Sequence, residues 1–456
     1  MTFALAMSRK SKDARMTSPR LLPLVMALGA ALAAAPAGAQ SLQQLYEAAR
    51  ANDAVWQAAR AQYDANLARA EQARAGVLPT ANLSSTIGRS DFENTNPATD
   101  RNFGTQTATL AAQQPLYRPA NWATWEQGKL QAELAKAQLT AASQDLIVRV
   151  SQAYFDVLAA QDTLAFVGAQ KSAVSEQLAS AKRNFEVGTA TITDTREAQA
   201  RFDLVTAQEI QAENDLRVRK LALDTLTGLT GSSPVPLAAP LNVPAPEPAS
   251  PDAWVSQGEA ASPVIQQART TLDIAEWETE KAKAGHKPTV DLTASYGIQR
   301  NLNGSATTVV DSRSNVGQVG VTFNLPLFAG FSTQNRIRET RSLEERARAD
   351  LEAARRNVAQ ATRTAYFGVI SGQGQVRALE AAEASSQLAL DANRLGYQVG
   401  VRINIDVLNA QSQLFQTKRD LAQARYNVLL GQLRLRQANG TLVPEDLTRL
   451  NALVAK

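Results

Sequence analysis

The chain carries the same sequence pattern twice, and this repeat limits what it can fold into. The segment Ala153–Leu158 (AYFDVL) matches Ala365–Ile370 (AYFGVI), and Phe185–Gly188 (FEVG) matches Tyr397–Gly400 (YQVG), both at an offset of 212 residues. A long internal repeat indicates one structural unit built twice. We therefore expect two copies, at residues 40–229 and 261–440. A proline-rich equatorial connector (230–260) joins them, and an equatorial C-terminal segment (441–456) follows.

Each copy contains two short segments in which apolar and polar residues alternate. In Val290–Ile298, for example, apolar side chains occupy the even positions and polar ones or Gly the odd positions. A period of two marks strands with one apolar and one polar face, and about 10 residues suffice for a tilted membrane strand. We predict β-hairpins at 77–117 and 287–328, with polar loops at Ser90–Asn102 and Arg300–Asn315.

Long proline-free helical stretches follow each hairpin. We predict helices at 119–186 and 331–398, then glycine turns at Gly188 and Gly400, then second helices at 193–229 and 404–440. Shorter helices are expected before the hairpins, at Leu42–Arg74 and Pro263–Ala284. The last long helix has a heptad of large apolar residues, which favours coiled-coil packing; these are Val407, Leu414, Leu421, Val428 and Leu435. The fold class is therefore α+β.

The N-terminus reads as an export signal. Residues 1–39 hold a basic stretch, an apolar run and an Ala-Gly-Ala box, which together predict a signal peptide cleaved between Ala39 and Gln40. An uncleaved anchor is the alternative reading. The sequence leaves open whether translation starts at Met1 or Met16.

Charge and composition exclude several classes of function. The formal net charge of +4 resides entirely in residues 1–39, so the remainder is neutral and lacks the basic footprint of a nucleic-acid-binding protein. The chain has no Cys and one His, which argues against zinc sites, iron–sulfur clusters, disulfides and thiol catalysis. We expect no enzyme activity, metal or cofactor.

Four strands cannot close a barrel, and an open sheet edge is not tolerated in lipid. If the strands span a membrane, the chain must oligomerise. A dimer would supply eight strands around a filled interior, and a trimer twelve strands around an aqueous lumen. Aromatic residues just past the strand ends would form an interfacial girdle or else pack as core at the helix starts; these are Tyr117, Trp122, Trp125, Phe328 and Phe331.

The chain resembles the TolC family of outer-membrane channel-tunnels. The resemblance covers residues 40–450 and is sharpest at Ala153–Leu158, Phe185–Asp194 (FEVGTATITD) and Tyr397–Leu408 (YQVGVRINIDVL). It implies a homotrimer with a 12-stranded outer-membrane barrel and a coiled-coil α-helical periplasmic barrel. It also implies a periplasmic adaptor and an inner-membrane ABC, RND or MFS translocase as partners. The implied function is a passive exit duct for type I protein secretion or multidrug efflux.

The resemblance also assigns roles at the periplasmic tip. Thr193 and Asp194 match tip links of the first copy, and Tyr397 and Arg402 match their partners on the second. Asp406 matches one aspartate of the constriction ring, whereas the second ring position is Asn409 instead of aspartate. Residues three apart share a helix face, so we expect 406 and 409 both to face the lumen.

Two alternatives stay open. Position alone favours helix capping over gating for Asp194 and Asp406, because an acid at a helix start stabilises the helix. At the level of the whole chain, a periplasmic coiled-coil adaptor or scaffold would explain the long helices and the export signal but not four amphipathic strands. The sequence does not identify the cargo, the adaptor or the pump.

Overall fold

A computed structural model describes residues 40–96, 98–237 and 244–452. The proposed signal peptide and Ala39 lie outside these residues, and Gln40 is the first residue described. The first copy holds α2 (Leu42–Asn52), α3 (Ala54–Ala75), β1 (Thr80–Thr95), β2 (Ala98–Tyr117), α4 (Pro119–Glu186) and α5 (Ile192–Thr227). The second holds α6 (Pro251–Ala261), α7 (Pro263–Lys283), the 3-10 turn η1 (Ala284–His286), β3 (Thr289–Leu302), β4 (Ser312–Asn324), α8 (Ser332–Gln398) and α9 (Asn404–Ala438). The C-terminal segment holds α10 (Glu445–Asn451).

The first helical segment of each copy is a pair of helices, which corrects two expectations. The predicted helix Leu42–Arg74 breaks at Asp53, whose backbone is extended and whose side chain accepts a hydrogen bond from the Trp56 N–H at 2.6 Å. In the second copy the extended residue Ser262 separates α6 from α7, and α7 agrees with the predicted helix Pro263–Ala284 to within one residue. The segment 230–260 therefore is not connector throughout, because α6 begins at Pro251, and proline is favoured at the first position of a helix.

The second long helices end earlier than predicted. The expected ranges 193–229 and 404–440 become Ile192–Thr227 and Asn404–Ala438. Gly228 and Gly440, which are repeat partners, adopt left-handed backbone angles with φ of 71° and 78°. A left-handed residue ends the helical hydrogen-bond pattern.

The four strands form one antiparallel sheet in the order β1-β2-β3-β4. The two hairpins lie where they were predicted, but the loop expected at Ser90–Asn102 is wrong. Pairing continues from Gly88↔Thr105 out to Thr95↔Ala98. Backbone hydrogen bonds extend an antiparallel ladder regardless of side-chain polarity, so a polar stretch does not by itself mark a loop.

The register gives the sheet one apolar face. The paired residues Leu83↔Leu110, Leu110↔Tyr296 and Leu292↔Val321 lie on the same side. The opposite side carries Ser, Thr, Asn and Gln, as in the pairs Ser84↔Thr109 and Ser295↔Gln318. The apolar side chains are not covered within the chain: Leu83 is 77% exposed and Val319 78%.

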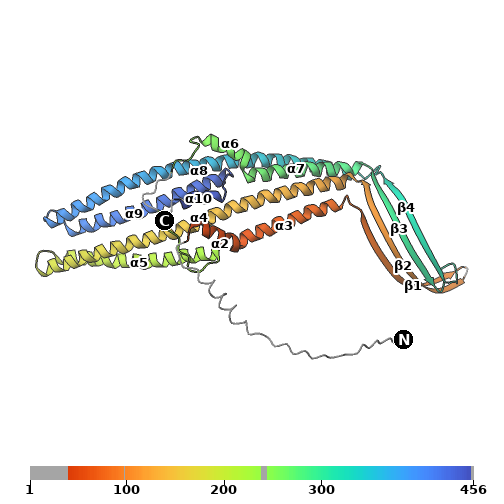
Figure 1. The fold of residues 1–456 in the computed structure, drawn as a ribbon, viewed down its shortest axis with the longest axis horizontal. Helices are drawn as coiled ribbons and strands as arrows, with labels where there is room; N and C mark the ends of the chain where they lie inside the picture. Colours follow the sequence, from red (N-terminus) through yellow and green to blue (C-terminus); the bar gives the residue numbers. More distant parts are fainter. Residues whose placement is uncertain (1–39, 97, 238–243, 453–456) are drawn as a thin grey trace, which may run out of the picture. The chain divides into compact units, whose positions relative to one another are not determined.

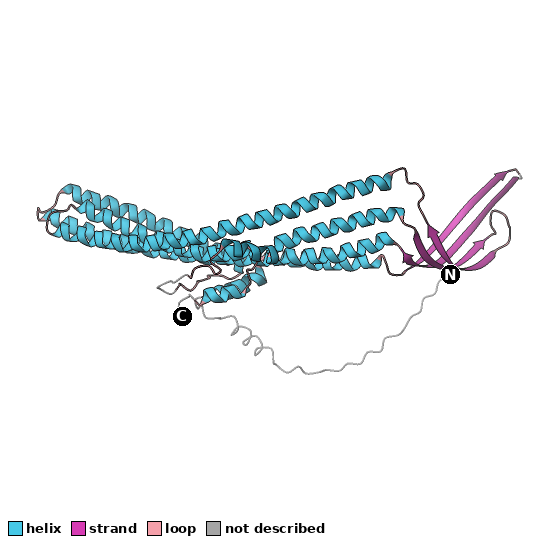
Figure 2. Cartoon of the chain, turned by 90° about the horizontal axis from the view of Figure 1, so that it is seen from above, coloured by secondary structure: helices cyan, strands magenta, loops and turns pink. Residues whose placement is uncertain are grey.

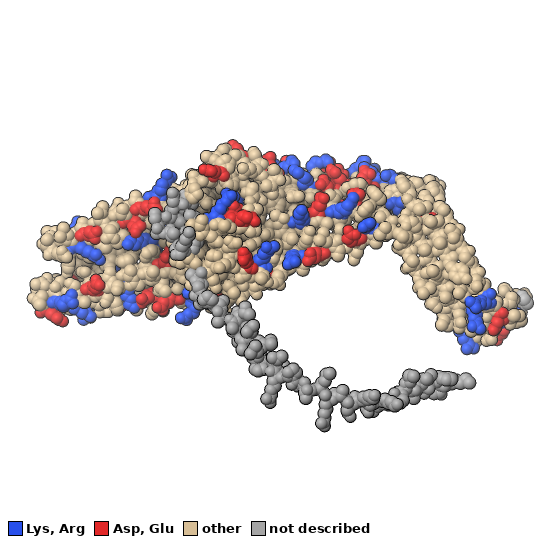
Figure 3. All heavy atoms as spheres, viewed as in Figure 1, with Lys and Arg blue, Asp and Glu red and all other residues tan. Residues whose placement is uncertain are grey.

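Charged residues avoid the central part of the sheet. On the face seen in Figure 3 they cover the helices and the loop end of the strands and leave the middle of the sheet bare. In sequence, one stretch of each strand lacks Asp, Glu, Lys and Arg altogether; these stretches are 80–88, 102–117, 292–299 and 314–324. The predicted strand length of about 10 residues describes these stretches better than the strands themselves, which have 13 to 20 residues.

The long helices pack in pairs, α4 with α5 and α8 with α9, and α4 also contacts α9. Figures 1 and 2 show the sheet at one end of these helices and the two helical turns at the other, with α6 and α10 beside their middle. All five predicted heptad residues of α9 are buried. A Cβ added at Gly372 on α8 would lie 2.9 Å from Val428 Cγ2 on α9, so the small residue permits close packing. None of the described helices is long and apolar enough to cross a membrane.

The duplicated AYF motif has a duplicated role. Tyr154 is fully buried and its hydroxyl donates a hydrogen bond to the Val235 carbonyl at 2.6 Å. Its repeat partner Tyr366 donates in the same way to the Ala249 carbonyl. Burial raises the pKa of Tyr154, so its hydroxyl stays protonated and remains a donor. The two tyrosines thus fasten both ends of the connector to the long helices.

We expect a Tyr154→Phe, Tyr366→Phe variant to release the connector. Each lost hydrogen bond costs about 1 kcal/mol, which raises local opening about fivefold. Limited proteolysis should therefore cleave between residues 230 and 250 faster than in the unaltered protein. Tyr296→Phe is the matched control, because Tyr296 is 51% exposed on the sheet. Equal cleavage in the double variant and the control would contradict the role of the tyrosines.

Candidate functional site

The predicted tip residues lie at the two helical turns farthest from the sheet. Gly188 and Gly400 occupy these turns with φ of 75° and 81°. After α4, the Thr189 N–H donates to the Asn184 carbonyl at 2.8 Å, and after α8 the Val401 N–H donates to the Gly396 carbonyl at 2.9 Å. Both glycines therefore form left-handed helix ends, which a residue with a Cβ adopts only at a cost.

Asp194 caps its own helix. Its Oδ2 accepts hydrogen bonds from the Thr191 N–H at 2.9 Å and from the Thr191 hydroxyl at 2.7 Å, and its own N–H donates to Thr191 Oγ1 at 3.2 Å. This is a reciprocal capping box at the start of α5. The capping alternative therefore holds for Asp194.

Asp406 occupies the equivalent position of the second copy but does not cap. The residue matching Thr191 is Ile403, which has no side-chain oxygen, and α9 has no side-chain cap. Asp406 Oδ2 instead lies 3.7 Å from Arg402 Nη1. The Arg402 side chain is 59% exposed and that of Asp406 34%. The carboxylate of Asp406 thus makes no capping hydrogen bond in its own helix, unlike that of Asp194.

Tyr397 and Asn409 connect the second hairpin to the first. The Tyr397 hydroxyl accepts a hydrogen bond from Asn184 Nδ2 on α4 at 3.5 Å. Asn409 Oδ1 accepts from Arg201 Nη2 on α5 at 2.8 Å. Thr193 is exposed, and its side chain makes no hydrogen bond within the part of the chain described.

The structure does not join the tip residues as the resemblance suggested. Asp194 bonds to Thr191, and Arg402 lies beside Asp406, so Thr193 and Asp194 contact neither Tyr397 nor Arg402 through a polar link within this one chain. Asp194 bonds to Thr191 and not to the second copy because Thr191 lies only three residues away and is held in place at the start of α5. Links between copies of the chain stay a prediction.

Asn404 is a tip residue that sequence reasoning missed. It is fully buried, its Nδ2 donates to the Asp194 carbonyl at 3.3 Å, and its Oδ1 accepts from Gln177 on α4. It thereby ties α9 to both helices of the first hairpin. The signal available in the sequence was a break in the repeat, because the first copy has Ile192 at the matching position.

The tips also expose apolar side chains. Val187, Val399 and Val401 are between 65% and 75% exposed. Phe185, Ile192 and Ile403 add further apolar surface at the same turns. Exposed apolar patches of this kind mark surfaces at which proteins bind one another.

A half-buried acid lies farther along the helix pairs. Asp162 on α4 accepts a hydrogen bond from the Tyr426 hydroxyl on α9 at 2.6 Å. Burial raises the pKa of Asp162, while the bond from Tyr426 opposes that shift by stabilising the carboxylate. The pair joins the two copies of the repeat. Among the residues that the structure describes, no group of three or more His, Asp or Glu side chains could hold a metal ion.

Known proteins share both the sequence and the fold. The family model for outer membrane efflux proteins matches residues 45–229 and 254–441. The outer membrane protein TolC of Vibrio cholerae is 34% identical, covering 95% of this chain and 98% of that protein. The alkaline protease secretion protein AprF of Pseudomonas aeruginosa is 33% identical, covering 95% and 91%. The crystal structure of the outer membrane protein VceC from Vibrio cholerae superposes with a TM-score of 0.76 at 20% identity, covering 88% and 96%.

The family match spans both copies of the repeat, and the relatives are matched over nearly their whole length. It confirms the resemblance derived from the tip and AYF segments. The chain therefore belongs to the outer membrane efflux protein family.

Proposed function

We propose that this protein is an outer-membrane exit duct that passes cargo without chemistry, in type I protein secretion, multidrug efflux or both. The observation that carries the proposal is the two-faced sheet. One face is apolar and exposed, the other is polar, and charge is missing from the central band. In a membrane, such strands place the apolar face against lipid and the polar face toward water. A periplasmic adaptor or scaffold that does not enter the membrane would not need an exposed apolar sheet face.

Three copies would close the barrel. In one chain β1 and β4 are the edges of the sheet, with unpaired backbone groups that lipid does not tolerate. A homotrimer pairs β1 of one copy with β4 of the next and yields twelve strands. The helices then form a coiled-coil barrel that extends into the periplasm, with α3 and α8 at the borders between copies.

The exposed tips support docking to a periplasmic adaptor and, through it, to an inner-membrane translocase of the ABC, RND or MFS class. Apolar side chains at both turns provide a surface for a partner helix. Nucleic acid is not proposed as a partner, because the chain after the signal peptide has no net positive charge with which to bind phosphates. The relatives include a protease secretion protein, and the matching family model is that of outer membrane efflux proteins, so both protein secretion and efflux are proposed, with the pump selecting the cargo.

Cell fractionation tests the proposal. We expect the mature protein in the outer-membrane fraction as a trimer that resists SDS until it is heated. A soluble periplasmic protein, or a monomer before heating, would contradict the duct and favour the scaffold.

The constriction should be only weakly sensitive to cations. One acidic ring, Asp406, attracts cations, but Asn409 adds no charge and holds the Arg201 guanidinium at 2.8 Å. We expect weaker block by divalent cations than in a tunnel with two aspartate rings. In planar bilayers Asn409→Asp should strengthen the block and Asp406→Ala should abolish it. If divalent cations block the unaltered protein tightly and this block disappears in Asp406→Ala, then one acidic ring suffices for tight block, and the expectation of weak block is contradicted.

A further inference from the structure

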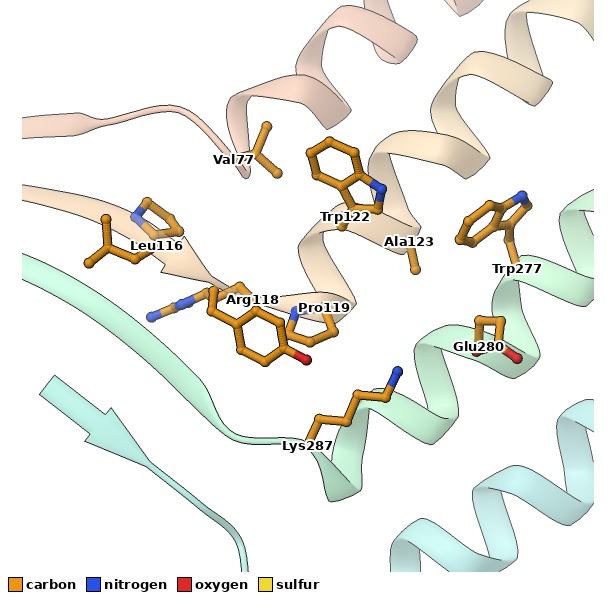
Figure 4. A pocket seen from close by; sticks show the side chains of 11 residues that line it. Val77, Leu116, Arg118, Pro119, Trp122, Ala123, Trp277, Glu280 and Lys287 are labelled. Carbon is orange, nitrogen blue, oxygen red and sulfur yellow. The ribbon is translucent and has the colours of Figure 1, made fainter.

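A pocket of about 440 Å³ lies where the sheet meets the helices (Figure 4). Its walls come from the end of β2, the start of α4, the end of α7 and the segment before β3. The lining includes three aromatic side chains, one Leu and two charged groups; these are Leu116, Tyr117, Trp122, Trp277, Glu280 and Lys287. The size is within the usual range of small-molecule sites.

The pocket is continuous with the apolar face of the sheet. Tyr117 pairs with Val290, which lies on that face. Leu116, which has no paired residue at the register shift beside it, is 56% exposed. Trp122 is 51% exposed and meets the Trp125 ring edge-on, with 4.9 Å between their centroids. Trp122 is therefore not a core residue at a helix start. Exposed Trp and Tyr at the end of an apolar band are typical of a membrane–water interface.

Lys287 is the cation of this pocket that has no ionic partner among the described residues. Arg118, also in the wall, makes two hydrogen bonds to Asp291, at 2.7 and 2.6 Å. Glu280 is paired with Lys283 at 2.6 Å. Lys287 is exposed, and Figure 4 shows its side chain directed into the pocket between α4 and α7. The pocket thus presents aromatic walls with one available positive charge.

The pocket lies away from the edges at which copies would meet. β2 and β3 are the inner strands of the sheet, and α4 and α7 pack against each other between α3 and α8. A neighbouring copy that pairs along β1 and β4 leaves this pocket uncovered. Its occupant must therefore come from the surroundings, and the adjoining apolar face indicates lipid.

We propose that this pocket holds the headgroup of a phospholipid from the periplasmic leaflet of the outer membrane. The phosphate lies at Lys287 Nζ, and the glycerol and upper acyl chain lie against Leu116, Tyr117 and Trp122. A phosphate near one lysine at a membrane surface gains roughly 1 kcal/mol, which corresponds to about a fivefold change in affinity. The site rests on the proposed membrane location, and it would fix the height of the duct in the bilayer.

Tryptophan quenching in detergent solution tests the site. Phosphatidylglycerol brominated on its acyl chains is titrated into the purified full-length protein, and quenching of Trp122 and Trp277 is followed. Lys287→Gln should weaken the apparent affinity about fivefold. Lys281→Gln is the matched control, because Lys281 lies near the end of α7, six residues before Lys287, but is paired with Glu278 at 3.5 Å and lies outside the pocket. Trp122→Phe should lower the amplitude of quenching.

Equal affinities of Lys287→Gln and Lys281→Gln, or quenching that survives Trp122→Phe undiminished, would overturn the lipid site. Either result in a protein that still forms SDS-resistant outer-membrane trimers leaves the duct intact. Absence of those trimers contradicts the proposed function itself, and the lipid site with it.

Discussion

A Val319→Arg variant is expected to lose the SDS-resistant trimer and disappear from the outer membrane. Val319 lies near the middle of β4, pairs with Ala294 on the apolar face and is 78% exposed in one chain. Arginine facing lipid near the bilayer midplane costs about 2–4 kcal/mol, and a trimer bears this cost three times, or about 6–12 kcal/mol. That is comparable to the whole stability of a typical folded domain. Fractionation and unheated gels report the result.

The matched control is the neighbouring residue. Gln318→Arg introduces the same side chain one position away, on the polar face, where Gln318 pairs with Ser295. Facing water, this arginine should be tolerated and the trimer retained. If both variants assemble, the apolar face does not meet lipid. If both fail, the effect does not depend on the face, and the assignment of the two faces is wrong.

Some parts of this fold could be predicted from the sequence and others could not. The repeat, the hairpins and the heptad of α9 were visible because they depend on periodic patterns, which the sequence carries directly. The break at Asp53 was missed because a single extended residue leaves no periodic trace. α6 was not predicted because it begins at Pro251, and a proline is as typical of a proline-rich connector as of the first turn of a helix. The loop at Ser90–Asn102 was wrong because backbone pairing extends a hairpin without apolar side chains.

The tip shows a different limit. The glycine turns and the acids near the helix starts could be placed from the repeat alone. Their partners could not, because Thr191 forms a capping box with Asp194 at the start of α5, whereas Ile403 offers Asp406 no side-chain oxygen, and this difference depends on one residue in each copy. Asn404 could be recognised as a link between the two copies only from the structure, which places Gln177 and the Asp194 carbonyl beside it. Buried polar residues acquire meaning from their partners, which lie far away in sequence.

An Arg402→Ser, Tyr397→Phe double variant is expected to open the tip, with a severalfold increase in single-channel conductance and greater antibiotic leak. The Arg402–Asp406 contact of 3.7 Å is exposed, and contacts of this kind contribute about 1 kcal/mol or less. The Tyr397–Asn184 hydrogen bond of 3.5 Å is long. In the proposed trimer these links would occur three times and together would hold the tip closed, so removing both kinds at once should shift the closed–open equilibrium strongly.

Arg394→Ser is the control for this double variant, since it removes an exposed arginine of α8 that forms no ion pair within the described residues. Unchanged conductance in the double variant would contradict the gating role of Arg402 and Tyr397.

The sensitivity of the channel to divalent cations provides a second readout from the same recordings. Removing Arg402 frees the carboxylate of Asp406, so the opened channel should also become more sensitive to divalent cations. An open channel with unchanged cation sensitivity would place Asp406 outside the conducting path, because a carboxylate that lines the lumen must respond when its own counter-charge is taken away.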